Sequence, residues 1–269
     1  MAESAAGSGI DTTAAEAFEA VLVPTIFGPW SRALVDLADP KPGERLIDVG
    51  CGTGAAARYA AERLGGGKAV AAIDLNPGMI AFGRTLDKEG AIDWHQGDIM
   101  AMPFADGAFD AVVGNQVLQF LSDRPKALAE MRRVMAKGGR AVFGVYCRIE
   151  LCPAHCAVAS ALGRHDVDPA GILNPYSFGD PVALGDVIAA AGFRDVSVVR
   201  RTMVARFASP KAFVDALAAG GPSARHALEQ LDADGLRQVI EDVAAALAQY
   251  VDDAGLRVVT ASNVAVARR

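Results

Sequence analysis

The sequence has little cysteine. Its 269 residues contain only Cys51, Cys147, Cys152 and Cys156. Cys51 lies inside a glycine-rich turn, and no secretion signal precedes it, so we expect reduced thiols rather than a disulfide framework. The group formed by the other three could bind a soft metal. We interpret them instead as small apolar residues of a buried loop, and predict no metal site.

Positive charge and long apolar runs are also scarce. The 26 Lys and Arg residues are outnumbered by 32 Asp and Glu residues, which gives a formal net charge of −6. A chain without a basic surface is a poor candidate for binding nucleic acid or an anionic membrane. No apolar run reaches the roughly 18–20 residues of a membrane span. Residues 1–13 are small and polar, unlike a signal peptide. They predict a disordered tail. Together with the net charge and the short apolar runs, this predicts a cytoplasmic protein without nucleic-acid or membrane partners.

From residue 14 onward, helical and strand patterns alternate. Residues 14–38 are predicted as helix interrupted at Pro24. Strands are expected at 45–49, 68–74, 92–95, 109–114, 140–146, 195–206 and 256–268. Helices are expected at 55–64, 77–88, 125–135, 181–191, 210–219 and 224–250. This order predicts an α/β fold: a doubly wound, mostly parallel, seven-stranded Rossmann-like sheet with helices on both faces.

The regular alternation stops after Tyr146. Residues 147–178 contain three prolines, which predict an irregular or short-helical insertion. Residues 207–251 form a second, helical excursion. We predict one domain over 14–269, with a cofactor-binding core at 44–146 and the two excursions as a lid.

The most informative segment is Leu46-Ile47-Asp48-Val49-Gly50-Cys51-Gly52-Thr53-Gly54. It predicts a strand, a tight turn and the start of a helix. Such a unit brings a ligand against bare backbone at the carboxyl end of a parallel strand. Glycine is expected there because a side chain would occupy the space of the ligand.

The turn alone leaves two ligands open. Residues 50–55 also satisfy the relaxed dinucleotide pattern G-x-G-x-x-A. Asp74 ends the next strand 20 residues after Gly54. A carboxylate there suits the ribose of either a nicotinamide dinucleotide or another adenosine ligand. A nicotinamide-dependent oxidoreductase would also need a catalytic Tyr/Lys or equivalent pair, and none is evident.

Further motifs favour the second ligand. Asp48 stands two residues before the first glycine, and Gln96-Gly97-Asp98-Ile99 follows the third strand. Residues 102–110 then lead into the fourth strand, followed by Ala129-Glu130-Met131-Arg132-Arg133-Val134 and Gly138-Gly139. With these motifs the chain resembles the class I S-adenosylmethionine-dependent methyltransferases, and within them the small-molecule group that includes ubiquinone and menaquinone biosynthesis enzymes (type 11 methyltransferase domain). The resemblance is strong over about residues 44–146.

The resemblance implies S-adenosyl-L-methionine as cofactor and a role for each matched position. Gly50, Gly52 and Gly54 would lie under the methionine part and the adenosine, and Asp74 would bind the ribose hydroxyls. Leu75 would contact the adenine. The cofactor-binding residues implied in this way are Asp48, Gly50, Gly52, Gly54, Asp74, Leu75, Asp98, Ile99 and Asn115, of which Asp98 would receive the adenine amino group. Asp48 and Asp98 could instead cap the turns that follow them.

Methyl transfer from a sulfonium is a direct displacement that requires alignment and exclusion of water, and needs a base only for a weakly acidic acceptor. We expect the small-molecule acceptor near the ends of the fourth and fifth strands, in an apolar pocket walled by Trp30, Gln116, Tyr146 and part of 147–178. Phe27, Tyr176 and Phe178 are further candidate walls. His155 is the candidate base, and Gln116 is a second candidate catalytic residue. The acceptor atom and the oligomeric state stay open.

Overall fold

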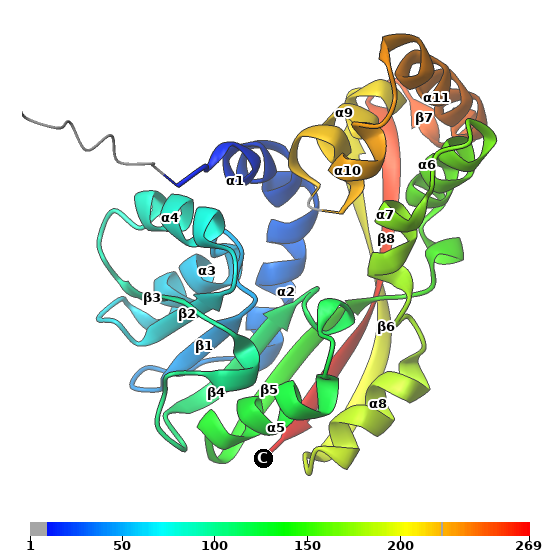
Figure 1. Ribbon diagram of the computed structural model, residues 1–269. Coiled ribbons are helices and arrows are strands. Elements are labelled where there is room, and N and C mark those ends of the chain that lie inside the picture. The colour runs from blue at the N-terminus through cyan, green and yellow to red at the C-terminus, as the bar shows by residue number, and fades with distance from the viewer. Residues whose placement is uncertain (1–9, 222) are drawn as a thin grey trace, which may run out of the picture.

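The computed structural model describes residues 10–221 and 223–269. In this part of the chain the strands form one sheet in the order β3-β2-β1-β4-β5-β8-β6, with β7 paired to β8 outside this path (Figure 1). The strands are β1 (Leu46–Val49), β2 (Val70–Asp74), β3 (Ile92–Gln96), β4 (Phe109–Asn115), β5 (Met135–Tyr146), β6 (Arg194–Phe207), β7 (Val251–Asp252) and β8 (Gly255–Arg268). The predicted fold class is therefore confirmed, and the two-residue β7 is an addition to the seven expected strands.

The first five strands are mutually parallel, whereas β8 runs antiparallel to both β5 and β6. β8 is the last strand of the chain but lies between β5 and β6. The carboxyl ends of β1, β2, β4 and β5 consequently share one edge of the sheet, which is where doubly wound proteins bind their ligands.

Helices cover both faces of the sheet (Figure 1). The helices of the α/β alternation are α3 (Ala55–Leu64), α4 (Pro77–Leu86), α5 (Arg124–Val134) and α8 (Pro181–Ala190). Successive residues of β4 point to opposite faces, so Val113 belongs to the apolar cluster of one face and Val112 to that of the other. This two-sided burial explains the continuous apolar runs of the central strands.

The N-terminal segment is one continuous helical run, and the expected interruption at Pro24 is wrong. α1 (Thr13–Ala17), the π-helix η1 (Phe18–Phe27) and α2 (Gly28–Ala38) follow one another without a break. Proline lacks the N–H of the α-helical ladder and its ring collides with the carbonyl one turn earlier. The wider π-helical turn accommodates Pro24, and Gly28 donates its N–H to Val23 five residues before it.

The two excursions lie at one end of the molecule, above β6 and β8 (Figure 1). The first contains α6 (Pro153–Arg164), α7 (Ala170–Leu173) and two short 3-10 turns, η4 (Ile149–Leu151) and η5 (Asn174–Tyr176). The second contains α9 (Pro210–Gly220), α10 (Ala224–Leu228), α11 (Ala233–Ala246) and η6 (Ala248–Tyr250). The expected single helix over 224–250 is therefore divided, because Asp232 caps a new helix by accepting the N–H of Gly235 at 2.7 Å.

Of the predicted tail 1–13, residues 1–9 lie outside the described residues, and Thr13 already belongs to α1. None of the helices in the described ranges is both long enough and apolar enough to cross a membrane.

Candidate active site

A cavity of about 470 Å³ lies at the shared edge where the parallel strands end. One end, which we name the glycine end, is lined by Asp48, Gly50, Cys51, Gly52 and Asp74. The other, which we name the aromatic end, is lined by Tyr146, His155, Ile172 and Tyr176. η1 covers the space between them through Phe18, Leu22, Ile26 and Phe27. Ligand pockets of proteins have volumes of this order.

The three glycines of the turn are required for different reasons. All have positive φ angles, which favour glycine. A Cβ atom on Gly50 would lie 2.4 Å from Val117, and one on Gly54 would lie 2.2 Å from Trp94. A Cβ on Gly52 would meet nothing closer than Phe18 at 3.8 Å. Only Gly52 therefore leaves space free for a ligand, whereas protein side chains occupy the space beside Gly50 and Gly54.

Asp74 joins the turn after β1 to the turn after β2. One carboxylate oxygen accepts the N–H of Gly52 at 2.8 Å, and the other accepts the N–H of Asn76 at 2.8 Å. Burial raises the pKa of this carboxyl, against the lowering effect of the backbone donors. Each carboxylate oxygen has a further lone pair, so Asp74 can accept hydrogen bonds from a ligand as well.

Asp48 is almost fully buried where β1 ends. Its carboxylate accepts the N–H of Ala57 at 3.0 Å in the first turn of α3, which is the capping role that the sequence left open. Burial, with a smaller contribution from the nearby Asp74 carboxylate, raises the pKa of Asp48 to about 7. Asp48 also lines the cavity, so a cationic ligand group at the glycine end would meet a carboxyl that ionises near neutral pH.

Asn115 is the last residue of β4 and Gln116 follows it, and both line the cavity. Asn115 donates its amide N–H groups to the Phe27 carbonyl at 3.2 Å and to the Ser31 hydroxyl at 3.0 Å. Its Oδ1 is buried and has no hydrogen-bond partner among the described residues. An unpaired buried carbonyl costs free energy, so this oxygen is available to a ligand donor.

Gln116 adopts a φ of 58°, in the left-handed region where non-glycine residues are uncommon. Its amide donates to the Ser262 hydroxyl at 2.8 Å and accepts the Gln119 amide at 3.1 Å. Strained backbone held by such a network is characteristic of functional sites.

The sequence of this chain is similar to the sequences of known methyltransferases. The sequence profile of the methyltransferase domain family matches residues 47–143. The nocamycin O-methyltransferase of Saccharothrix syringae is 30% identical over 214 residues, which cover 70% of this chain and 72% of that enzyme. The demethylmenaquinone methyltransferase of Thermus thermophilus is 34% identical over 181 residues, covering 61% of this chain and 80% of that enzyme. The chain belongs to the class I S-adenosylmethionine-dependent methyltransferases.

A solved structure agrees with this membership at the level of the fold. The phosphoethanolamine N-methyltransferase 2 of Haemonchus contortus, in complex with S-adenosyl-L-methionine, superposes with a TM-score of 0.61 and 19% identity. The alignment covers 96% of this methyltransferase but only 57% of the Haemonchus chain. The sequence expectations of family and enzyme class are thus confirmed.

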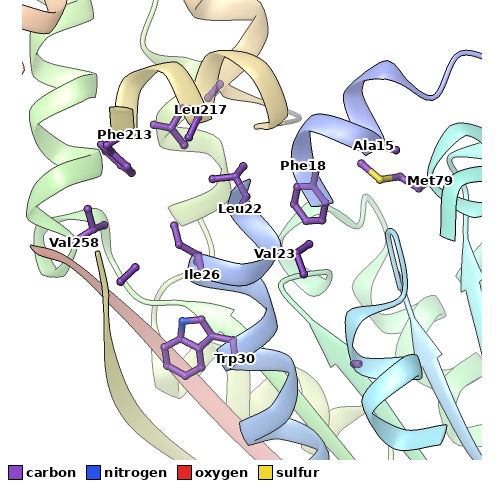
Figure 2. Packing of buried hydrophobic residues seen from close by; sticks show 14 of the residues in the cluster. Ala15, Phe18, Leu22, Val23, Ile26, Trp30, Met79, Phe213, Leu217 and Val258 are labelled. Carbon is purple, nitrogen blue, oxygen red and sulfur yellow. The ribbon is translucent and has the colours of Figure 1, made fainter. Parts of the chain in front are cut away.

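The structure places Trp30 outside the cavity of the methyltransferase, contrary to the expected pocket wall. Trp30 is 1% exposed and donates its indole N–H to the Thr260 hydroxyl of β8 at 3.0 Å. Figure 2 shows Trp30 below Leu22 and Ile26 on the same side of the N-terminal helix. Ile26, one helical turn earlier, takes the position that was expected for Trp30.

The structure treats the other expected cofactor and wall residues differently. Leu75 lines the cavity and is 68% exposed, and Ile99 also lines it. The Asp98 carboxylate instead accepts the N–H of Met100 at 2.8 Å, as a cap of the 3-10 turn η2 (Ile99–Ala101), and does not line the cavity. Contact between Asp98 and the cofactor stays a prediction. Phe178 stacks under the guanidinium of Arg124 at 4.1 Å and is likewise outside the cavity.

Sequence reasoning missed the contribution of α9 and α10. Leu217 and Ala224 line the cavity, and Figure 2 shows Leu217 above Leu22 of η1. The sequence predicted a helical lid here, but a small aliphatic residue on an amphipathic helix gives no signal of which cavity it faces. Among the described residues, no group of His, Cys, Asp and Glu side chains is arranged to hold a metal ion.

Proposed function

We propose that this methyltransferase transfers the methyl group of S-adenosylmethionine to a small-molecule acceptor by direct displacement within the cavity. The observation that carries the proposal is that one cavity contains both ends. It joins a glycine turn and two carboxylates at one end to an apolar pocket at the other.

The glycine end fits the proposed cofactor. The space over Gly52 leaves room for a ligand against bare backbone, and the Asp74 oxygens retain lone pairs for the ribose hydroxyls. Leu75 and Ile99 provide apolar contacts for the adenine. Asp48 and the unpaired Asn115 Oδ1 are suited to the cationic methionine part. When bound, S-adenosylmethionine supplies a methyl group on a cationic sulfur, which a nucleophile can displace.

The chain's own contribution is to align the acceptor and to exclude water. Leu22, Ile26 and Phe27 cover the cavity from the N-terminal helix, and Leu217 closes it from α9. Holding two reactants in line converts a bimolecular reaction into an effectively unimolecular one. Water kept out of the cavity cannot compete as a nucleophile.

Titration calorimetry tests the cofactor. We expect S-adenosylmethionine and S-adenosylhomocysteine to bind, and NADH to give no heat. Binding of NADH without binding of S-adenosylmethionine would overturn the proposal. Incubation with methyl-labelled S-adenosylmethionine and a metabolite library then tests transfer, because label in a small product identifies the acceptor.

A further inference from the structure

The aromatic end of the cavity is built from flat side chains. The rings of Tyr146 and Tyr176 stack with centroids 4.9 Å apart and an interplanar angle of 25°. The His155 imidazole lies 5.6 Å from the Tyr176 ring and meets Phe213 edge-on at 5.0 Å. These rings come from β5, η5, α6 and α9, so the chain assembles them from four separate elements. Aromatic rings prefer to stack on another ring or to meet its edge, so this end of the cavity favours an aromatic ligand over a saturated one.

The same end contains a buried polar atom without a partner. His155 and Tyr176 are 7% and 6% exposed, and both line the cavity. His155 Nδ1 has no hydrogen-bond partner among the described residues, whereas the Tyr176 hydroxyl has the Cys152 thiol beside it. Buried polar groups are normally paired, so the orphaned nitrogen of His155 indicates a ligand that carries a hydrogen-bonding group.

Charged groups are confined to the other end. Asp48 and Asp74 are the charged side chains among the described residues that line the cavity, and both belong to the glycine end. A phosphate, carboxylate or ammonium group buried at the aromatic end would therefore lack a counter-charge, which is costly. This part of the ligand is uncharged.

His155 is suited to accepting a hydrogen bond and poorly suited to taking a proton. Burial lowers the pKa of His155 to about 4, and no neighbouring carboxylate offsets it. An efficient general base has a pKa near the working pH. The imidazole therefore stays neutral, with one nitrogen able to accept a hydrogen bond. This changes the role that the sequence suggested for His155.

We propose that the aromatic end is a subsite for an uncharged, flat, conjugated ring bearing a hydroxyl group, which donates its hydrogen bond to His155. His155 is then a specificity-determining residue that positions the acceptor. The subsite rests on the proposed function in one respect: the glycine end of the same cavity must hold the methyl donor.

Equilibrium dialysis of the full chain against three probes tests the subsite. The probes are 2-naphthol, naphthalene and the saturated alcohol 2-decalol, each with and without S-adenosylhomocysteine. We expect 2-naphthol to bind at least about tenfold more tightly than either of the others. Equal binding of 2-naphthol and naphthalene would overturn the hydroxyl contact. Equal binding of 2-naphthol and 2-decalol would overturn the preference of the subsite for a flat ring. If none of the three probes binds, both the hydroxyl contact and the preference for a flat ring are overturned.

Two variants assign the contact to His155. His155→Phe keeps a flat ring and should lower the affinity for 2-naphthol about tenfold while leaving naphthalene unchanged. His155→Gln retains a hydrogen-bond acceptor and should restore part of the preference. A His155→Phe protein that keeps the full preference for 2-naphthol would refute the assignment. Should that variant fail to fold, His155→Leu replaces it as the variant without a hydrogen-bond acceptor, with the same expected loss of the preference for 2-naphthol over naphthalene.

The two proposals can fail separately. If calorimetry shows no binding of S-adenosylmethionine but the protein still prefers 2-naphthol to naphthalene, the proposed function alone is refuted. Normal cofactor binding without 2-naphthol preference would refute the subsite alone.

Discussion

The carboxylate of Asp74, at the end of β2, accepts the backbone N–H of Gly52, in the turn after β1, at 2.8 Å. The two residues are 22 positions apart in sequence, yet this bond fixes the one glycine of the turn that faces open space. Asp74 thus shapes the glycine end in addition to offering lone pairs to a ligand. Its replacement should change the cofactor site in two ways at once.

We expect Asp74→Ala to weaken S-adenosylmethionine binding by at least about tenfold, because hydrogen bonds to a charged group contribute roughly 1.5–3 kcal/mol each. Titration calorimetry measures the loss. Asp232→Ala is the matched control, since Asp232 also accepts a backbone N–H as a cap but does not line the cavity. A well-folded Asp74→Ala protein with an unchanged dissociation constant would exclude the ribose role. A loss in Asp98→Ala as large as in Asp74→Ala would support the adenine contact that the family resemblance implies.

Gly52 and Gly54 should respond differently to the same change. Gly52→Val introduces a branched side chain into open space, and we expect it to abolish cofactor binding while helical circular dichroism persists. Gly54→Ala places a Cβ atom 2.2 Å from Trp94, so we expect the melting temperature to fall instead. Both residues have positive φ angles, and strain of ~1–2 kcal/mol is common to both variants. Survival of binding in Gly52→Val would show that the cofactor does not cross this turn.

Much of the cofactor-binding core could be predicted from sequence because its signals are local. An apolar run followed by alternate glycines specifies a strand and a tight turn, and Asp74 follows at the end of the next strand. The N-terminal helix and the two excursions carry no such local signals. Each turn of π-helix adds a residue relative to the α-helical period, so the face occupied by Trp30 after Pro24 cannot be read from a 3.6-residue repeat. The capping Asp232 was readable in principle, as an acid three residues before Gly235 in an otherwise helical pattern.

Because of Asp48, both the stability of the protein and its affinity for the cofactor should depend on pH, in opposite directions. Burial raises the pKa of its carboxyl to about 7, from a value of ~3.9 in an unfolded chain. Between these values the folded chain holds a proton that the unfolded chain has lost. The free energy of unfolding therefore decreases as pH rises from about 4 to about 7. The affinity for the cationic cofactor should instead increase as pH rises through about 7, because the carboxyl becomes an anion.

Asp48→Asn separates this effect from other titrations. The amide oxygen can still accept the N–H of Ala57, but it carries no charge. We expect the variant to be more stable than the wild type above pH 7, and its cofactor affinity to lose the rise near pH 7. Chemical denaturation and calorimetry at several pH values measure both. Parallel pH profiles in the two proteins would mean that Asp48 does not titrate in this range.

Trp30 and Ile26 provide a test of the corrected pocket wall. Trp30→Phe removes the hydrogen bond to Thr260, and we expect a loss of ~1–3 kcal/mol in stability without a change in acceptor KM. Ile26→Ala enlarges the cavity that Ile26 lines, so we expect both lower stability and an altered acceptor KM. Methyl-transfer kinetics with an acceptor found in the library screen give the comparison. A changed KM in Trp30→Phe would return Trp30 to the pocket wall.

Glu19 connects the N-terminal helix to the cofactor site. Its carboxylate accepts the Thr53 hydroxyl at 2.5 Å and pairs with Arg58 at 2.6 Å, and the two charged side chains are only 20% and 23% exposed. Thr53 lies in the glycine turn and Arg58 in α3, so Glu19 holds η1 over the glycine end. Glu19→Gln removes the charge from both contacts. Since Glu16→Gln makes the same change on the exposed side of the same helix, it is the matched control.

We expect Glu19→Gln to raise the dissociation rate of S-adenosylmethionine on the order of tenfold, because charge-assisted bonds at the closing helix are lost and η1 opens more often. Hydrogen exchange should quicken over residues 18–27, whereas Glu16→Gln should resemble the wild type. Stopped-flow dissociation and exchange mass spectrometry supply the two measurements. Faster exchange with an unaltered dissociation rate would show that η1 moves without gating the cofactor, and the N-terminal helix would then be a wall of the cavity rather than its lid.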